Sequence, residues 1–319
     1  MIETEGLTKS FSRGKATVEA VRGIDLSVDE GELVALLGPN GAGKSTTLRM
    51  LTTLLVPTSG SARIAGHSIT AERDAVRRSL GYVGQGNGGG HNQRVRDELV
   101  TQGLCYGLAK RESGIRADEL LTALDLTELA KRTVSTLSGG QRRRLDIAIG
   151  LVHRPPLLFL DEPSTGMDPQ SRANLWEHIL RLRQEMGTTI VLTTHYLDEA
   201  DSMAERVIVI DKGTIIADDT ADALKADLAG DLVTLTVETG YSAVSLASLL
   251  ERADGVRDIT ITGDRLNIRV VRADRALPDL LRLSDSHGTR IQSADLSRPT
   301  LDDVFLGLTG RSLRENATV

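Results

Sequence analysis

Short apolar runs alternate with amphipathic segments over the first two thirds of the chain. Runs of strand length predict the buried strands of a mostly parallel sheet at residues 32–38, 156–161, 188–195 and 206–211. Apolar positions at helical spacing predict helices at about 44–54, 115–130, 139–152, 170–186 and 197–204. Strands and helices that alternate in this way are typical of an α/β fold.

The two ends of the chain show a different pattern. Residues 18–32, "VEAVRGIDLSVDEGE", alternate between apolar and polar and contain turn residues, which predicts an antiparallel β subdomain beside the α/β core. Near residue 222 the pattern changes, and residues 232–297 follow the order β-α-β-β-α-β of a small ferredoxin-like α+β domain. A closing helix follows at 300–310. We therefore expect one domain over residues 1–222 and a C-terminal accessory domain over residues 223–319.

Composition and charge exclude several classes of protein. The chain has 319 residues, which is ample for a buried core, and its net charge of −6 argues against a general nucleic-acid binder. Cys105 is the only cysteine, which excludes a disulfide framework and fits a reducing cytosolic setting. The first residues lack a signal pattern, and the apolar runs are too short to span a bilayer. We expect a chain that does not cross a membrane but can dock on a protein that does.

The first chemical motif is "GPNGAGKST", residues 38–46, which directly follows a predicted strand and opens a predicted helix. Its glycines allow the backbone to curl with its N–H groups facing the α- and β-phosphates of a nucleotide. Lys44 can reach the β/γ oxygens, and the hydroxyl of Ser45 can bind Mg²⁺. A chance glycine-rich turn is the alternative, but the flanking strand and helix favour a phosphate-binding loop.

The second motif is "LLFLDEPSTGMDP", residues 157–169. Asp161 ends a strand at the carboxyl edge of the sheet, where ligands of open α/β folds bind, and it can hold Mg²⁺ or its water shell. Glu162 is placed to orient or deprotonate an attacking water molecule. In isolation such a pair is more often a polar strand end and helix cap. Together with a phosphate loop it favours catalysis.

Three further residues are candidates because of where they lie. His195 ends a strand at the same sheet edge; alone it would be structural, but among these residues a contact to the γ-phosphate is favoured. Gln85, in "GYVGQG", offers a neutral oxygen to Mg²⁺ or water, and is otherwise an ordinary loop glutamine. Phe11, just ahead of the β-rich segment, can stack on an adenine ring or serve as a core aromatic.

A second anion-binding helix start occurs in "LSGGQRRRLDIA", residues 137–148. Ser138 can cap a helix whose apolar positions include Leu145, Ala148 and Val152, and free N–H groups follow the cap. Two such helix starts in one fold are redundant unless each meets a different face of the same ligand. ATP would then hold two copies together, and hydrolysis would release them.

These motifs resemble the nucleotide-binding subunit of ATP-binding cassette (ABC) transporters. The resemblance covers about residues 1–222 and rests on "GPNGAGKST", Gln85, "LSGGQ", "LFLDEP", "STGMDP" and His195, in the family's order and spacing. It implies a P-loop NTPase fold of the ABC ATPase type, with an antiparallel β subdomain and a helical subdomain at about 86–153. A kinase that uses the same phosphate loop would not need "LSGGQ".

The resemblance also implies a set of functional residues and the cofactors ATP and Mg²⁺. Catalysis would involve Glu162, His195 and Gln85, and Mg²⁺ would be held by Ser45, Gln85 and Asp161, partly through water. The ATP-binding residues would be Phe11, Gly38, Asn40, Gly41, Gly43, Lys44, Ser45 and Thr46. The signature residues Ser138, Gly139, Gly140 and Gln141 would act on the nucleotide of a second copy in a head-to-tail dimer, with Asp168 at the seam.

The same resemblance predicts a membrane partner. A separate transmembrane permease would insert a short helix beside the Gln85 loop, placing this chain in the cytoplasm at the inner face of the cell membrane. Residues 84–93, "GQGNGGGHNQ", depart from the family pattern by their glycines. Glycine makes a loop costlier to order, so either a slack surface turn or a groove shaped for an unusual partner is expected.

The C-terminal part has a narrower likeness. "RPTLDDVFLGLTGR", residues 298–311, resembles the tail of the daunorubicin-resistance type of ABC ATPase, which powers efflux of drugs or natural products. We therefore expect an Mg-dependent ATPase that powers export. Two alternatives are an importer subunit and a non-transport ABC ATPase acting on ribosomes or DNA. The acidic charge and the single cassette disfavour the latter, and no nucleic-acid partner is expected.

Overall fold

The computed structural model describes residues 1–14, 16–226, 230–238, 240–297 and 299–310. The chain forms two compact units, Met1–Asp218 and Asp219–Val319. Among the residues described, no helix combines the length and the apolar character needed to cross a bilayer. The α/β class expected for the first unit and the α+β class expected for the second are confirmed.

The centre of the first unit is a six-stranded sheet in the order β10-β9-β3-β8-β7-β6. The strands are β3 (Leu33–Leu37), β6 (Leu80–Val83), β7 (Leu157–Asp161), β8 (Thr189–Thr194), β9 (Arg206–Asp211) and β10 (Thr214–Asp219). Strands β9, β3, β8, β7 and β6 run parallel, and β3, β7 and β8 are buried at every position. The register pairs Leu37 with Thr194 and Asp161 with Thr193, so the carboxyl ends of three strands meet at one edge.

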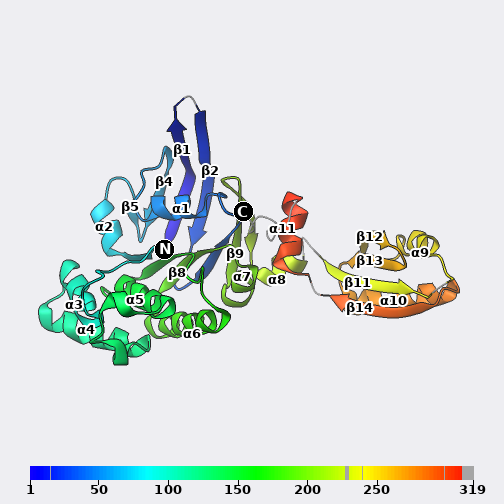
Figure 1. Ribbon diagram of the computed structural model, residues 1–319. Coiled ribbons are helices and arrows are strands. Elements are labelled where there is room, and N and C mark those ends of the chain that lie inside the picture. The colour runs from blue at the N-terminus through cyan, green and yellow to red at the C-terminus, as the bar shows by residue number, and fades with distance from the viewer. Residues whose placement is uncertain (15, 227–229, 239, 298, 311–319) are drawn as a thin grey trace. The chain divides into compact units, whose positions relative to one another are not determined.

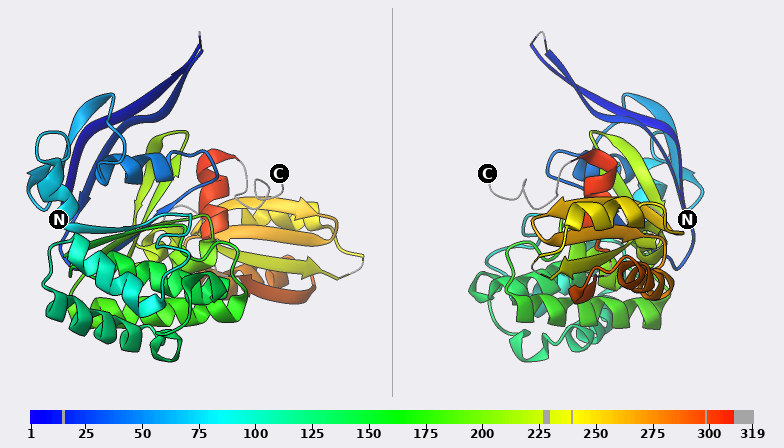
Figure 2. Two further views of the ribbon diagram at one scale, coloured as in Figure 1. Left: turned by 60° about the vertical axis from the view of Figure 1, so that its left-hand side comes forward. Right: turned by 90° about the vertical axis from the view of Figure 1, so that its right-hand side faces the viewer.

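A second, antiparallel sheet has the order β2-β1-β4-β5, formed by β1 (Ile2–Arg13), β2 (Ala16–Val28), β4 (Ser59–Ile64) and β5 (His67–Ser68). Its apolar face shares one core with a face of the parallel sheet, through residues such as Ile2, Val28 and Phe159. Figure 2 shows β1 and β2 extending as a long hairpin beyond the rest of this unit. The β structure begins at residue 2, so Phe11 lies inside β1 and not ahead of the β-rich segment as expected.

Helices cover the parallel sheet and form a helical region at one side of the unit (Figure 1). They are α1 (Lys44–Leu51), α2 (Arg73–Arg78), α3 (Val95–Cys105), α4 (Lys110–Ala123), α5 (Gly139–Leu151), α6 (Pro169–Met186) and α7 (Leu197–Met203). The helix expected at 115–130 is wrong at both ends, because α4 starts at Lys110 and the chain turns at Asp125, whose φ of 53° is left-handed. Short 3₁₀ turns follow at Thr127–Leu129 and Val134–Thr136.

The second unit has its own sheet and core. Its strands β11 (Asp231–Val237), β12 (Val256–Thr262), β13 (Arg265–Val270) and β14 (Ile291–Ser297) lie in the order β12-β13-β11-β14 and pair antiparallel. Helices α9 (Ala243–Leu250) and α10 (Ala273–Ser286) pack on one face through a single apolar cluster. This is the ferredoxin-like arrangement predicted.

Two helices flank that sheet in the chain. Helix α8 (Ala221–Leu224) precedes it, and α11 (Leu301–Thr309) follows it and contacts α8. Helix α11 begins with a capping box in which Thr300 and Asp303 exchange hydrogen bonds, so the closing helix expected at 300–310 is confirmed. Arg298 and Arg311, the ends of the expected tail motif, lie outside the described residues.

Candidate functional site

The loop between β3 and α1 encloses a groove at the carboxyl edge of the parallel sheet. Two of its glycines, Gly41 and Gly43, have left-handed φ values of 81° and 108°. A Cβ atom on Gly38 would lie 2.2 Å from the carbonyl oxygen of Ile210, so this position admits only glycine. The groove is lined by Val18, Ala20, Asn40, Gly41, Ala42, Gly43, Lys44, Ser45, Thr46, Gln85 and Glu162.

Lys44, the first residue of α1, places a positive charge inside this loop. The residue is 4% exposed, and its ammonium donates to the carbonyl oxygens of Gly38 (2.6 Å) and Pro39 (3.1 Å). Burial lowers the pKa of Lys44, while the carboxylates of Glu162 and Asp161 oppose that shift. An anion that enters the loop therefore meets a largely desolvated cation, whose attraction is stronger than it would be in water.

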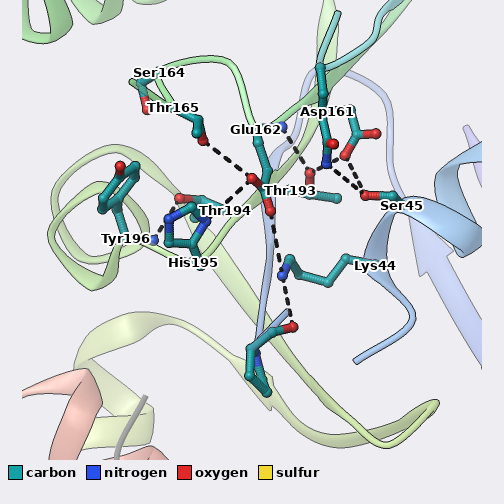
Figure 3. A network of polar contacts seen from close by, with 12 residues as sticks. Lys44, Ser45, Asp161, Glu162, Ser164, Thr165, Thr193, Thr194, His195 and Tyr196 are labelled. Carbon is teal, nitrogen blue, oxygen red and sulfur yellow. Dashed lines mark hydrogen bonds and ion pairs between the residues drawn. The ribbon is translucent and has the colours of Figure 1, made fainter. Parts of the chain in front are cut away.

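Asp161 is the hub of a polar network at the end of β7 (Figure 3). Its side chain is fully buried, and its Oδ1 accepts from Ser45 Oγ at 2.8 Å and Thr193 Oγ1 at 2.7 Å. Tyr82 donates its hydroxyl to Oδ2 at 3.4 Å, and Gln85 donates Nε2 to Ser45 Oγ at 3.1 Å. The structure therefore brings the three expected metal-site residues together and adds Thr193 and Tyr82, which the sequence analysis missed.

Glu162 projects toward the groove from a strained backbone. Its φ of 46° is left-handed, and its N–H donates to Thr193 Oγ1 at 3.0 Å. Its carboxylate accepts from Thr165 Oγ1 at 3.2 Å and lies 3.8 Å from Lys44 Nζ and 3.4 Å from His195 Nδ1. His195 foremost, together with Lys44 and Thr165, holds the pKa of Glu162 below its ordinary value against the opposing effect of burial. Glu162 is therefore an ionised carboxylate beside the phosphate loop.

Arg143 is a second residue that the sequence analysis missed. It lies on α5, is buried, and donates to the carbonyl oxygens of Pro163 (2.7 Å), Gly84 (2.6 Å) and Asp161 (3.1 Å). These carbonyls belong to the segments that carry Glu162 and Gln85. The position of Arg143 shortly after "LSGGQ" was the available signal, but its partners are main-chain atoms that no sequence motif names.

The signature helix α5 starts with an exposed turn. Ser138 Oγ accepts from the N–H of Gln141 at 3.4 Å, and Gln141 Oε1 accepts from the N–H of Ser138 at 3.0 Å. This capping box occupies both side chains. Gly139 lines a depression next to the groove, together with Glu162 and Thr165.

Asp168 and Phe11 lie away from the hub. Asp168 is exposed and caps α6 by accepting from the N–H of Ser171 at 2.9 Å; hydrogen bonding from the side chain of Ser171 foremost, and then from its N–H, lowers the pKa of Asp168. Phe11 is 42% exposed on the β1–β2 hairpin and pairs across the strands with Val18, which lines the phosphate-loop groove. The ammonium of Lys9 lies 5.2 Å from the centre of the Phe11 ring.

The glycine-rich segment 84–93 is tied to the helical region. The N–H of Gly88 donates to Asp146 Oδ1 at 3.1 Å, and Arg142 donates to the carbonyls of Gly88 and Gly89. Gly89 has a φ of 49°, and a Cβ there would lie 3.1 Å from Ile149 Cδ1. The segment is largely exposed, but Gly88 and Gly89 allow it to approach α5 closely.

The fold and the site define a class of protein. A phosphate loop, an Asp-Glu pair, a strand-end histidine and a capped "LSGGQ" helix on this sheet form the nucleotide-binding cassette of ABC proteins. The family described as "ABC transporter" matches residues 21–165, and "ATP-binding protein DrrA1-3-like, C-terminal domain" matches residues 220–309. The ATP-binding cassette MJ0796, solved as a dimer in a post-hydrolysis state bound to ADP and Pi, aligns with a TM-score of 0.63 and 27% identity, over 69% of this chain and 98% of that one.

Relatives extend the match over almost the whole chain. The daunorubicin/doxorubicin resistance ATP-binding protein DrrA of Streptomyces peucetius is 42% identical over 99% of this chain and 94% of its own length. The Nod factor export ATP-binding protein I of Paraburkholderia xenovorans is 37% identical over 98% of each chain. The chain belongs to the DrrA-like ATP-binding subunits of ABC transporters. It is an ATPase subunit that binds and hydrolyses ATP.

Proposed function

We propose that this chain is the Mg-dependent ATPase subunit of an exporter that removes a drug or natural product through a separate membrane permease. The observation that carries the proposal is the connected network of Lys44, Ser45, Asp161, Glu162 and His195 at one sheet edge (Figure 3). Matching relatives described by drug resistance and by Nod factor export support the export direction and the cargo class. The chain would act in the cytoplasm at the inner face of the membrane.

The residues around Asp161 fit a magnesium ion. Ser45, Gln85 and Asp161 offer hydroxyl, amide and carboxylate oxygens, the ligand types that Mg²⁺ prefers. In the described part of the chain, no group of three or more His, Cys, Asp or Glu side chains is placed to hold a metal. A cation here would take its other ligands from phosphate and water, as Mg²⁺ usually does. When bound, Mg²⁺ would neutralise charge on the β- and γ-phosphates.

The chain's own residues would bind the nucleotide and activate the attacking water. The N–H groups of the phosphate loop and Lys44 would hold the phosphates, with Asn40, Gly41, Gly43 and Thr46 lining the groove and Phe11 placed for the base. Glu162, whose ionised side chain lines the groove, would orient and deprotonate the attacking water. His195, 3.4 Å from Glu162, would contact the γ-phosphate and keep that carboxylate in place.

A second copy of the chain would complete each site. The exposed start of α5 (Ser138, Gly139, Gly140 and Gln141) presents main-chain N–H groups and the positive end of the helix dipole, which suits the γ-phosphate of a nucleotide held by another copy. Asp168, exposed at the start of α6, would lie at the seam. The dimeric state of the MJ0796 cassette supports a dimer of this chain. The second unit would act as an accessory domain.

The experiment that tests the export function uses the E162Q variant, which keeps the size of the side chain and removes its charge. It is tagged, expressed in the native cells, and isolated from detergent-solubilised membranes with Mg-ATP present. We expect the variant to run as a dimer in gel filtration and to carry a polytopic membrane protein at near-equal stoichiometry. K44A is the control, and we expect it to lose the dimer. Recovery only from the soluble fraction with ribosomes or DNA would overturn transport, and a monomer with bound ATP would overturn the dimer.

A further inference from the structure

Glu199 is a buried carboxylate that the roles described above do not use. It lies on α7, four residues after His195, and its residue exposure is 3%. A buried carboxylate is costly unless several partners satisfy it. In this chain the partners of Glu199 come from three different segments, and two of these segments carry proposed catalytic residues.

One oxygen of Glu199 fixes the backbone around His195. Thr194 Oγ1 donates to Glu199 Oε2 at 2.9 Å, and the same hydroxyl accepts from the N–H of Tyr196 at 2.9 Å. These two bonds form a relay that spans His195 from the residue before it to the residue after it. The position of the imidazole therefore depends on a hydroxyl that Glu199 orients.

The other oxygen holds the loop that follows Glu162. Ser164 Oγ donates to Glu199 Oε1 in a short hydrogen bond, and the carbonyl of Ser164 accepts from the N–H of Met167 at 3.1 Å. Ser164 lies two residues after Glu162 and four before Asp168. The same carboxylate thus ties the proposed catalytic base and the proposed seam residue to the strand end that carries His195.

Arg172 provides a third connection. Its Nε lies 3.7 Å from Glu199 Oε1, and its guanidinium lies 4.2 Å from the centre of the Tyr196 ring. That ring packs on the imidazole of His195, with centroids 4.2 Å apart. The positive charge of Arg172, which comes from α6, compensates the buried carboxylate and lies over the Tyr196 ring that packs on the histidine.

We propose that Glu199 is a positioning residue that holds Glu162 and His195 in the relative positions that ATP hydrolysis requires. It touches neither the phosphate loop nor the reacting atoms, so it acts through Ser164 and Thr194. The inference rests on the proposed catalytic roles of Glu162 and His195. It predicts that loss of Glu199 slows the chemical step and leaves nucleotide binding by the Lys44 loop intact, because misplaced catalytic groups cost rate more than affinity.

The test compares purified full-length E199A and E199Q with D198N, in which the neighbouring exposed carboxylate of α7 is neutralised. Steady-state ATPase rates give kcat, and equilibrium binding of ATP in the presence of EDTA gives Kd. We expect E199A to lose about tenfold to a hundredfold in kcat with Kd within about twofold of wild type. E199Q keeps two polar atoms in place and should lose less, and D198N should match wild type. If E199A does not fold, S164A and T194V each remove one arm and carry the same test.

A double-mutant cycle separates positioning from general destabilisation. Adding E199A to H195A should lower the single-turnover rate by a much smaller factor than adding E199A to wild type, because the histidine that Glu199 positions is already gone. Unchanged kcat in E199A, a parallel rise in Kd, or losses that multiply in the double variant would each overturn the inference. A wild-type hydrolysis rate in H195A or E162Q would instead overturn the proposed catalytic roles, and the inference with them.

Discussion

At the scale of single residues, Glu162 combines two features that reduce stability. Its left-handed backbone costs on the order of 1–3 kcal/mol in a non-glycine residue, and its side chain is only 11% exposed. Contacts to Thr193, Thr165, Lys44 and His195 offset part of this cost. Strain held in place by neighbouring groups in this way fixes the direction of a side chain, which is what a positioned base requires.

The lowered pKa of Glu162 predicts a specific pH dependence of stability. The ionised side chain contributes stability above its unfolded pKa of about 4.3, and this contribution is lost as pH falls through the lower folded-state pKa. We therefore expect wild type to lose stability relative to E162Q as pH falls from about 5 to about 3.5. Urea unfolding of both proteins across this range measures the difference. If the free energy of unfolding of wild type minus that of E162Q stays constant or rises as pH falls, the assignment is contradicted.

The sequence predicts some site residues far better than others. Lys44, Ser45 and Asp161 were found because each belongs to a motif whose spacing reflects its chemistry. Thr193 was not found, because its bond to Asp161 depends on the register between β7 and β8, which pairs these two residues directly. Glu199 was missed for a related reason, since its partners are hydroxyl groups brought together only when α7 folds back on the sheet.

At the scale of elements, α5 is the connection between the helical region and the sheet. Arg143 supplies this connection by donating to three main-chain carbonyls: that of Asp161 at the end of β7, that of Pro163 in the loop that follows, and that of Gly84 after β6. Desolvation lowers the pKa of its guanidinium, opposed chiefly by Asp146 and Asp161. Loss of such a group leaves several buried acceptors without a donor.

We expect R143M, which keeps an unbranched apolar stem but lacks the guanidinium and so removes every donor, to lower the free energy of unfolding by about 3 kcal/mol. The exposed Arg111 on α4 offers a matched control, and R111M should change stability by less than about 0.5 kcal/mol. Chemical unfolding measures both variants. Equal effects of the two substitutions would show that the three carbonyl bonds contribute nothing specific.

Element boundaries were predicted well where apolar periodicity is strong and poorly elsewhere. Helix α6 was expected at 170–186 and spans Pro169–Met186, with Asp168 as its cap. Helix α3 was missed because it buries Glu98 beside Val95 and Leu99, so no continuous apolar stripe marks it in the sequence. The end of α4 was misplaced because the apolar positions continue past the left-handed turn at Asp125.

At the scale of the whole molecule, the two units have separate cores. The residues of the nucleotide groove all belong to the first unit, and the apolar cluster of the second is formed only by its own elements. A ligand that binds one folded unit stabilises that unit and leaves an independent one unchanged.

Calorimetry can test this independence. We expect two unfolding transitions. ATP with Mg²⁺ should raise the midpoint temperature only of the transition that belongs to residues 1–218. At a hundredfold excess of ligand over Kd, the free energy of unfolding of that unit should rise by about 2.7 kcal/mol. K44A should remove the shift without changing the second transition. Equal shifts in both transitions would show that the units unfold as one.

The first turn of α5 has a consequence that reaches beyond one copy of the chain. Gly139 and Gly140 both have ordinary negative φ values, and a Cβ on Gly139 would meet nothing within 4 Å, while one on Gly140 would meet Met167 Cε at 3.4 Å. Alanine would suit both positions of the isolated helix better, because glycine is the poorer helix former. The fold of a single chain therefore does not require glycine at these two positions. Side chains are absent from the start of this helix, which leaves its main chain open to a molecule outside the chain.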